Sequence, residues 1–158
     1  MRRIVIALLT ITLAFSLTAC GAGFNASTRQ VSQVTDGVEG AIKTAGNNIK
    51  LAGVLIVETP GGAGVLVGTV VNSLLDEDAL LGVRINGVVA NVTGADTLAQ
   101  NAPIRFEGES ANAKAVVPVL NAKAGSHVQV TMFFAHAGEI TLLAIVRDQR
   151  DTYAGITA

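Results

Sequence analysis

The sequence predicts an all-β domain, an antiparallel β-sandwich that follows an N-terminal signal peptide and a flexible tether. Three observations indicate this fold: short runs rich in Val, Leu and Ile with alternating polarity, turn residues between these runs, and no long stretch of helical periodicity. About seven such runs follow residue 46, which suits a sandwich of short antiparallel strands. We therefore expect the folded domain to occupy residues 47–158.

The first predicted strand, residues 49–58, is apolar at both alternating sets of positions. A strand of this kind is typically central, or covered on both faces. Because successive side chains on a strand point to opposite faces, we expect Ile49, Leu51, Leu55 and Val57 to share one face.

A turn and two further strands come next. Residues 59–62, Thr-Pro-Gly-Gly, form a turn signal, and residues 65–72 are a second apolar run of strand length. Leu81, Val83 and Ile85 then alternate with small or polar residues, which predicts a half-buried strand with these three side chains in the core.

The second half of the domain contains four more runs of strand type, at residues 104–106, 114–120, 126–135 and 139–147. Pro118 has no N–H group to donate, so its strand is expected at a sheet edge. The last two runs predict a hairpin. In its first strand, we expect four side chains to face the core: Val128, Val130, Met132 and Phe134. The remaining segment, residues 148–158, is expected to be a polar tail with Tyr153 as its only large anchor.

Composition excludes several classes of function. A formal net charge of −1 excludes a nucleic-acid-binding protein that depends on a broad basic face. A single cysteine excludes an internal disulfide and a cysteine-rich zinc site. A hydrophobic content of 50% with 15% charged residues excludes a disordered chain.

The N-terminus has the pattern of an export signal. Two arginines precede an uncharged apolar run at residues 4–17, which is shorter than the ~20 residues that span a bilayer. The run ends in Leu-Thr-Ala-Cys, and this resembles the bacterial lipobox, in which the cysteine receives a diacylglyceryl group and becomes the new N-terminus. We therefore predict a signal peptide at residues 1–19, lipidation at Cys20, and attachment to the outer side of the cell membrane. An ordinary signal peptide that happens to contain a cysteine is the alternative.

Residues 20–46 are rich in Gly, Ala, Ser, Thr and Asn, which predicts a flexible tether after the lipidated cysteine. Removal of the signal peptide removes two arginines and leaves a formal charge of −3. The mature chain then offers no basic patch to anionic lipid, so we expect the lipid anchor to hold the protein at the membrane.

Few side chains can bind a metal. The candidate ligands are Met132, His136 and His127, because Cu(I) prefers thioether and imidazole groups. His127 and Met132 are five residues apart and point to opposite faces of a regular strand. The alternative interpretation is a core methionine with two solvated histidines.

Other patterns give little support for catalysis. The run Asp76-Glu77-Asp78 lacks the spaced oxygen ligands and the glycine of a calcium loop, and we interpret it as a solvated turn. Ser110 follows Gly108 as in a nucleophile elbow, but the closing glycine is absent. We therefore predict that the protein is not an enzyme.

Three segments carry a family resemblance, and they occur in a fixed order. They are V-G-T-V-V-N at residues 67–72, D-A-L-L-G-V at residues 78–83, and K-A-G-S-H-V-Q-V-T-M-F-F followed by A-G-E-I-T-L within residues 123–142. With these segments the chain resembles LpqE-like envelope lipoproteins of high-GC Gram-positive bacteria and, more distantly, the PCu(A)C copper chaperones. The resemblance implies a cupredoxin-like, immunoglobulin-like sandwich.

The resemblance also implies where copper ligands would lie. Chaperone members carry a His and a Met after the D-x-L-x-G-V segment and a later His-x-Met. The corresponding stretches here, residues 84–92 and 116–122, contain neither residue type. Two functions remain open. The first is a non-enzymatic, cofactor-free envelope lipoprotein that binds or presents a ligand or another envelope protein. The second is a divergent copper chaperone that uses Met132 and His136.

Overall fold

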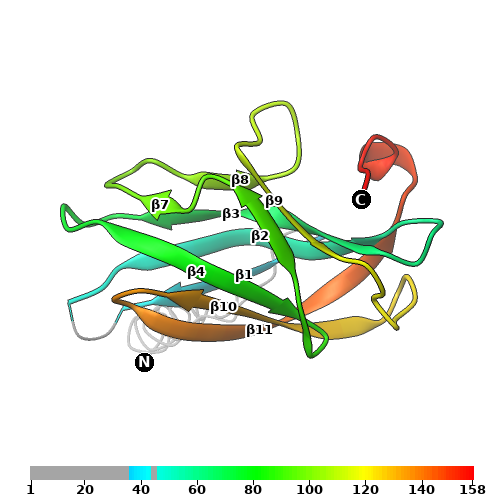
Figure 1. Cartoon of the computed structure of the whole chain (residues 1–158), viewed down its shortest axis with the longest axis horizontal. Helices are drawn as coiled ribbons and strands as arrows, with labels where there is room; N and C mark the ends of the chain where they lie inside the picture. Colours follow the sequence, from blue (N-terminus) through cyan, green and yellow to red (C-terminus); the bar gives the residue numbers. More distant parts are fainter. Residues whose placement is uncertain (1–35, 44–45) are drawn as a thin grey trace, which may run out of the picture. The chain divides into compact units, whose positions relative to one another are not determined.

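The computed structural model describes residues 36–43 and 46–158, in which nearly all regular secondary structure is β-strand (Figure 1). In chain order the strands are β1 (Val38–Ile42), β2 (Ile49–Glu58), β3 (Gly64–Asn72), β4 (Asp78–Ile85), β5 (Val88–Val89), β6 (Asn91–Gly94), β7 (Thr97–Leu98), β8 (Ile104–Phe106), β9 (Ala113–Val117), β10 (His127–Phe134) and β11 (Gly138–Asp148). A short 3-10 helix, Asp151–Tyr153, follows them. In this part of the chain, no helix has the length and apolar character needed to cross a bilayer.

Two sheets enclose the main core. β5, β4, β10 and the first part of β11 form one sheet, and β1, β2, β3, β8, β9 and β6 form the other. β11 continues from the first sheet into the second, where its last three residues pair in parallel with β2. Buried side chains from both sheets meet in one apolar cluster. The prediction of an all-β sandwich is therefore confirmed.

A bulge at Gly53 divides β2. The ladder between β2 and β3 shifts register between Ala52 and Leu55, and Gly53 has φ +63°, in the left-handed region that favours glycine. An extra residue in one strand reverses the alternation of side chains beyond it. Odd-numbered residues of β2 therefore face the main core before Gly53, and even-numbered residues face it after Gly53.

This reversal overturns one prediction and confirms another. Ile49 and Leu51 face the main core before the bulge, whereas Leu55 and Val57 beyond it belong to a separate cluster. The prediction that these four side chains share a face is wrong. Coverage on both faces is confirmed for residues 54–57, which are all buried.

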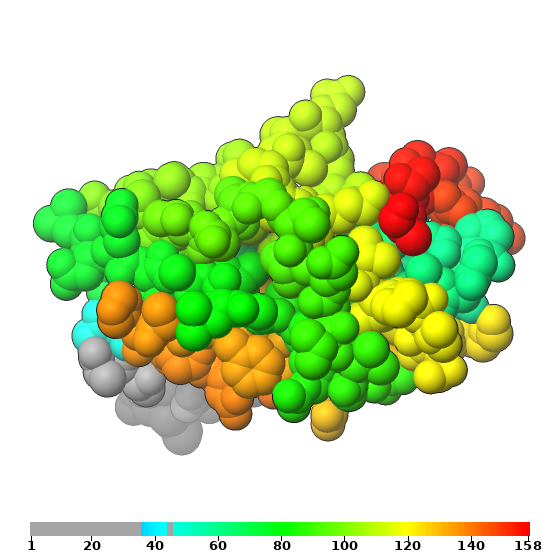
Figure 2. Space-filling view, in the orientation of Figure 1, coloured from blue at the N-terminus to red at the C-terminus, as the bar shows by residue number. Residues whose placement is uncertain are grey.

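The separate cluster is formed by Leu55, Val57 and Val65 of β2 and β3, and Ile156 of the C-terminal segment packs onto it. Figure 2 shows the C-terminal residues, in red, at the same end as the teal turn that follows β2. Ile156 is only 8% exposed and therefore also anchors this segment. The prediction that Tyr153 is its only large anchor is wrong. The Tyr153 hydroxyl lies 3.2 Å from the Asp36 carboxylate, to which it donates a hydrogen bond.

A register shift in the ladder between β10 and β4 changes which side chains of β4 face the core. Phe133 of β10 pairs with Gly82, and Phe134 pairs with Leu80, so Leu81 is skipped by the ladder. Leu81 is 69% exposed, and Leu80 is buried in its place. The prediction that Leu81 faces the core is wrong. The same prediction is confirmed for Val83 and Ile85, which are buried.

β9 ends at Val117, so Pro118 lies just beyond the strand and has no ladder position to fill. β6 pairs with one side of β9, and β3 and β8 pair with the other. The prediction of an edge strand is therefore wrong, because a proline at the end of a strand does not interrupt its pairing.

The hairpin of β10 and β11 is confirmed, with Phe134 paired to Gly138 across the turn. All four side chains expected in the core from β10 are buried.

β1 falls inside the predicted tether, residues 20–46, and pairs with β2, so the sheet begins before residue 47. The predicted signal peptide, Cys20 and the tether up to residue 35 lie outside the described residues.

Candidate functional site

β6 and β9 pair in the second sheet and line a cleft of about 590 Å³, which we call the β6–β9 cleft. Its lining residues are Ala63, Asn91, Thr93, Lys114, Val116, Pro118 and Ala158. Ligand-binding clefts commonly have this size and combine apolar walls with a few polar groups.

The strand register explains why these side chains meet. Asn91 lies opposite Val116, and Thr93 lies opposite Lys114. Directly opposed residues of antiparallel strands project on the same face of a sheet. The alternate residues point the other way, and Ala115 is fully buried in the main core. The cleft therefore lies on the outer face of the sheet.

Lys114 supplies the one cationic group of this lining. Its Nζ lies 3.4 Å from the Thr157 hydroxyl and 3.7 Å from a Glu107 carboxylate oxygen. Neither Thr157 nor Glu107 belongs to the lining itself, whereas Ala158, the last residue of the sequence, does. The cleft thus combines one ammonium group, which has a carboxylate beside it, with two neutral polar side chains and an apolar wall.

The two stretches in which the family resemblance implies copper ligands meet at this cleft. Residues 84–92 end in β6 and residues 116–122 begin in β9, so Asn91 pairs with Val116 at the cleft. The two stretches also meet away from it, where the Asn86 side-chain amide donates to the Leu120 carbonyl oxygen at 2.9 Å. In the described part of the chain, no His, Met or Cys lines the cleft. The residues present therefore do not fit a copper centre of soft ligands at this position.

The three candidate metal ligands lie elsewhere and apart from one another. Met132 is fully buried in the main core, and its strand partners are Ile140 and Val83. His127 is exposed at the start of β10, whereas His136 follows the end of that strand, so ~25 Å of extended chain separates them. Within residues 36–43 and 46–158, no group of three or more His, Cys, Asp or Glu side chains could hold a metal ion.

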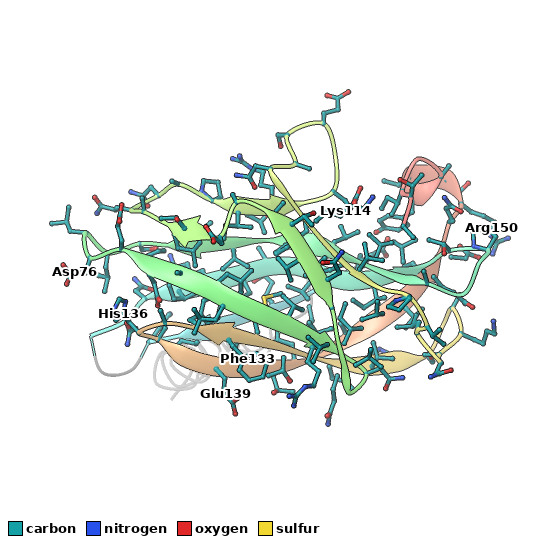
Figure 3. All side chains as sticks on the ribbon, viewed as in Figure 1. Asp76, Lys114, Phe133, His136, Glu139 and Arg150 are labelled. Atoms are coloured by element: carbon teal, nitrogen blue, oxygen red, sulfur yellow. The ribbon has the colours of Figure 1, made fainter. Side chains whose placement is uncertain are left out.

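A second cleft, of about 420 Å³, lies where β3 leads into β4, and Asn72, Asp78 and His136 contribute to its lining. Figure 3 shows Asp76 and His136 at the same end of the sandwich, with Lys114 well away from both. The buried polar groups of this cleft already have partners. The Asn72 amide donates to two carbonyl oxygens and accepts from the Leu74 N–H.

Asp78 is only 5% exposed, so it does not belong to a solvated turn as predicted, although Asp76 and Glu77 are exposed. Its carboxylate accepts hydrogen bonds from the backbone N–H groups of Ala79, His136 and Ala137 at 2.7, 2.9 and 2.9 Å.

Burial disfavours the charged form of Asp78, but these three donors and the nearby His136 side chain outweigh it. Together they hold the pKa of Asp78 below its ordinary value. Asp78 therefore fixes the turn of the β10–β11 hairpin. Sequence reasoning missed this role because the partner turn lies 58 residues further along the chain.

Comparison with solved structures supports the architecture. The copper-bound PCuAC domain from PmoF2 is similar, with a TM-score of 0.56 and 21% identity over 70% of this chain and 97% of that one. The apo PCuAC domain from PmoF1 gives a TM-score of 0.58 and 16% identity over 70% of this chain and 98% of its own. At these identities the likeness shows a PCuAC-like fold. No protein-family model matches the chain, and no curated protein is similar to it in sequence.

Proposed function

We propose that this chain is a lipid-anchored protein of the bacterial envelope, similar to the LpqE-like lipoproteins. Its non-enzymatic sandwich binds a small organic ligand in the β6–β9 cleft and has no copper centre. One observation carries the proposal. The two stretches that would hold copper meet at a cleft whose described lining contains no copper-ligating side chain. A ligand-sized cleft with mixed polar and apolar walls stands in that place.

The proposed anchor is Cys20, the chain's only cysteine, which stands at the end of an apolar run with a lipobox pattern. Two acyl chains hold a protein at a membrane where one is marginal, and each buried CH₂ contributes ~0.8 kcal/mol. A diacylglyceryl group on this thiol therefore needs no membrane-spanning helix beside it.

Substitution of the proposed anchor has a large expected effect. In cells that express the full chain, Cys20→Ser should move the protein from the membrane fraction to the soluble fraction, or leave it as an uncleaved precursor. Incorporation of a labelled fatty acid should fall to background. A Cys20→Ser variant that still takes up the label would contradict lipidation at this residue.

The alternative function is a divergent copper chaperone, which the copper-bound state of one similar structure favours. It requires Met132 to leave the main core and join His136 at the hairpin turn. Cu(I) titration of the mature chain, residues 20–158 with Cys20→Ser, separates the two functions. We expect no binding stronger than that of an exposed histidine, and a tight one-to-one site would favour the chaperone.

A further inference from the structure

The sheet of β5, β4, β10 and β11 has an apolar outer face. Of the five large hydrophobic side chains that are exposed in the described part of the chain, three belong to this sheet: Leu81 of β4, Val89 of β5 and Leu143 of β11. They lie on its outside, since the residue before each of them packs in the main core. Phe133 of β10 also points outward, because both of its neighbours in the strand are buried. We call the surface formed by these four side chains and the residues among them the outer β10 face.

The outer β10 face carries one positive and one negative side chain, on either side of β10. Arg84 of β4 pairs with Thr131, and Glu139 of β11 pairs with Phe133 (Figure 3). The Arg84 Cζ atom lies 5.5 Å from the centre of the Phe133 ring, and this contact fixes the position of both side chains. Arg84 and Glu139 are exposed, and neither forms an ion pair with another described residue of the chain. Both charges are therefore available to a partner.

The charge pattern of this face restricts the kind of partner. The polar side chains that lie among these residues, Gln129, Thr131 and Thr141, are uncharged. The Thr131 and Thr141 hydroxyls hydrogen-bond to each other at 2.9 Å. An anionic surface would be repelled by Glu139 as strongly as it is attracted by Arg84. The face suits a partner that is also apolar and that offers one charge of each sign, and a second copy of the same face has these properties.

The strand register shows how two copies of this face would match. A two-fold axis along β10 places β4 of one copy opposite β11 of the other, so that the two charges meet twice. Arg84 is level with residue 131 of β10 and Glu139 with residue 133, an offset of roughly 7 Å along the strands. The arginine and glutamate side chains together are long enough to cover this offset. The Phe133 rings then lie near the axis, between the two ion pairs.

We propose that the outer β10 face is a dimer interface, which packs against the same face of a second copy of this chain. Arg84 of each copy pairs with Glu139 of the other, and the exposed apolar side chains are covered between the two sheets. Face-to-face packing of sheets commonly buries such side chains. The inference goes beyond the proposed function, because the β6–β9 cleft belongs to the other sheet and takes no part in this interface.

The size of the face predicts a weak dimer. The three strands β4, β10 and β11 run side by side, and the first and second of them have eight residues each. At the usual spacing of strands and residues, the face measures roughly 14 Å by 27 Å. This is less than the ~800 Å² per partner of a standard stable interface. We therefore expect monomers and dimers to exchange, with a dimer fraction that rises with protein concentration.

Analytical ultracentrifugation of residues 20–158 with Cys20→Ser tests the dimer, from micromolar to millimolar concentration. This segment includes every residue of both apolar clusters, so it retains the whole core. Arg84→Glu should weaken dimerisation about tenfold, because it replaces two attractive contacts by two repulsive ones. Glu139→Arg should have the same effect. The double variant restores both pairs with reversed charges, and its affinity should return to within about threefold of the parent value.

Arg105→Glu is the matched control. Arg105 is an exposed arginine of β8, a strand of the other sheet, and its substitution makes the same change in net charge. The dimer affinity of this variant should equal that of the parent. Thermal unfolding of each variant shows whether a loss of dimer reflects a loss of fold.

Three outcomes would contradict the inference. The first is the absence of a dimer at millimolar concentration, and the second is a dimer that Arg84→Glu leaves unchanged or that Arg105→Glu weakens equally. The third is a double variant that dimerises as weakly as the single variants, which would exclude the reciprocal Arg84–Glu139 pairs. None of these outcomes affects the proposed lipid anchor or the β6–β9 cleft, which lie outside the interface.

Discussion

Replacement of Met132 by alanine is expected to lower the free energy of unfolding by about 3 kcal/mol. The side chain is fully buried, and its strand neighbours, Val83 of β4 and Ile140 of β11, hold the backbone on both sides. A paired central strand cannot move inward to fill the space, so the substitution leaves a cavity. Urea denaturation of residues 20–158 with Cys20→Ser measures the loss directly.

Met132→Leu is the matched control. Leucine has a similar volume and no sulfur, so it should cost less than about 1.5 kcal/mol. If Met132 were a metal ligand, both substitutions would remove the thioether and would lower copper affinity equally, whatever their different effects on stability. A Met132→Ala variant as stable as its parent would contradict the assignment of Met132 to the core.

Asp78→Asn is expected to destabilise the protein by about 2 kcal/mol at neutral pH, which is the scale of a charge-assisted hydrogen bond lost from a buried site. The asparagine keeps one acceptor oxygen, but its NH₂ group then faces backbone N–H donors of Ala79, His136 or Ala137. Asp76→Asn, in the exposed part of the same turn, is the control and should have little effect.

The effect of Asp78→Asn should also depend on pH. A carboxyl group whose pKa is lower in the folded state contributes stability above its unfolded value, near 3.8, and this contribution is lost as the pH falls through the folded pKa. The difference in unfolding free energy between parent and variant should therefore be constant near pH 7 and shrink below pH 4. A difference that grows in acid would contradict a lowered pKa for Asp78.

The parts of the fold that the sequence predicted correctly depend on local patterns. The alternation in β10 predicted which side chains face the core, because that strand runs without interruption through its ladder with β11. The same rule failed in β2 and β4, where bulges at Gly53 and Leu81 reverse the alternation. A glycine inside a strand often marks a bulge, so the signal at Gly53 was available.

The candidate site depends on contacts that no local pattern contains. The turn of the β10–β11 hairpin is fixed by Asp78, from a distant strand, so the acidic run resembled a solvated turn. The β6–β9 cleft forms because Asn91 and Thr93 pair with residues more than 20 positions later. Composition predicted that metal-binding side chains are scarce. Only the pairing of β6 with β9 shows that the two stretches without His or Met meet at a cleft large enough for a small molecule.

Anaerobic titration of Cu(I) in competition with a chromophoric chelator tests the central claim most directly, that a PCuAC-like sandwich here lacks a copper centre. The protein comprises residues 20–158 with Cys20→Ser, compared with the same segment carrying Met132→Leu or His136→Ala as well. We predict that none of the three withdraws Cu(I) from the chelator and that their curves coincide. A one-to-one site that the parent shows and a folded, equally stable Met132→Leu variant lacks would contradict the account.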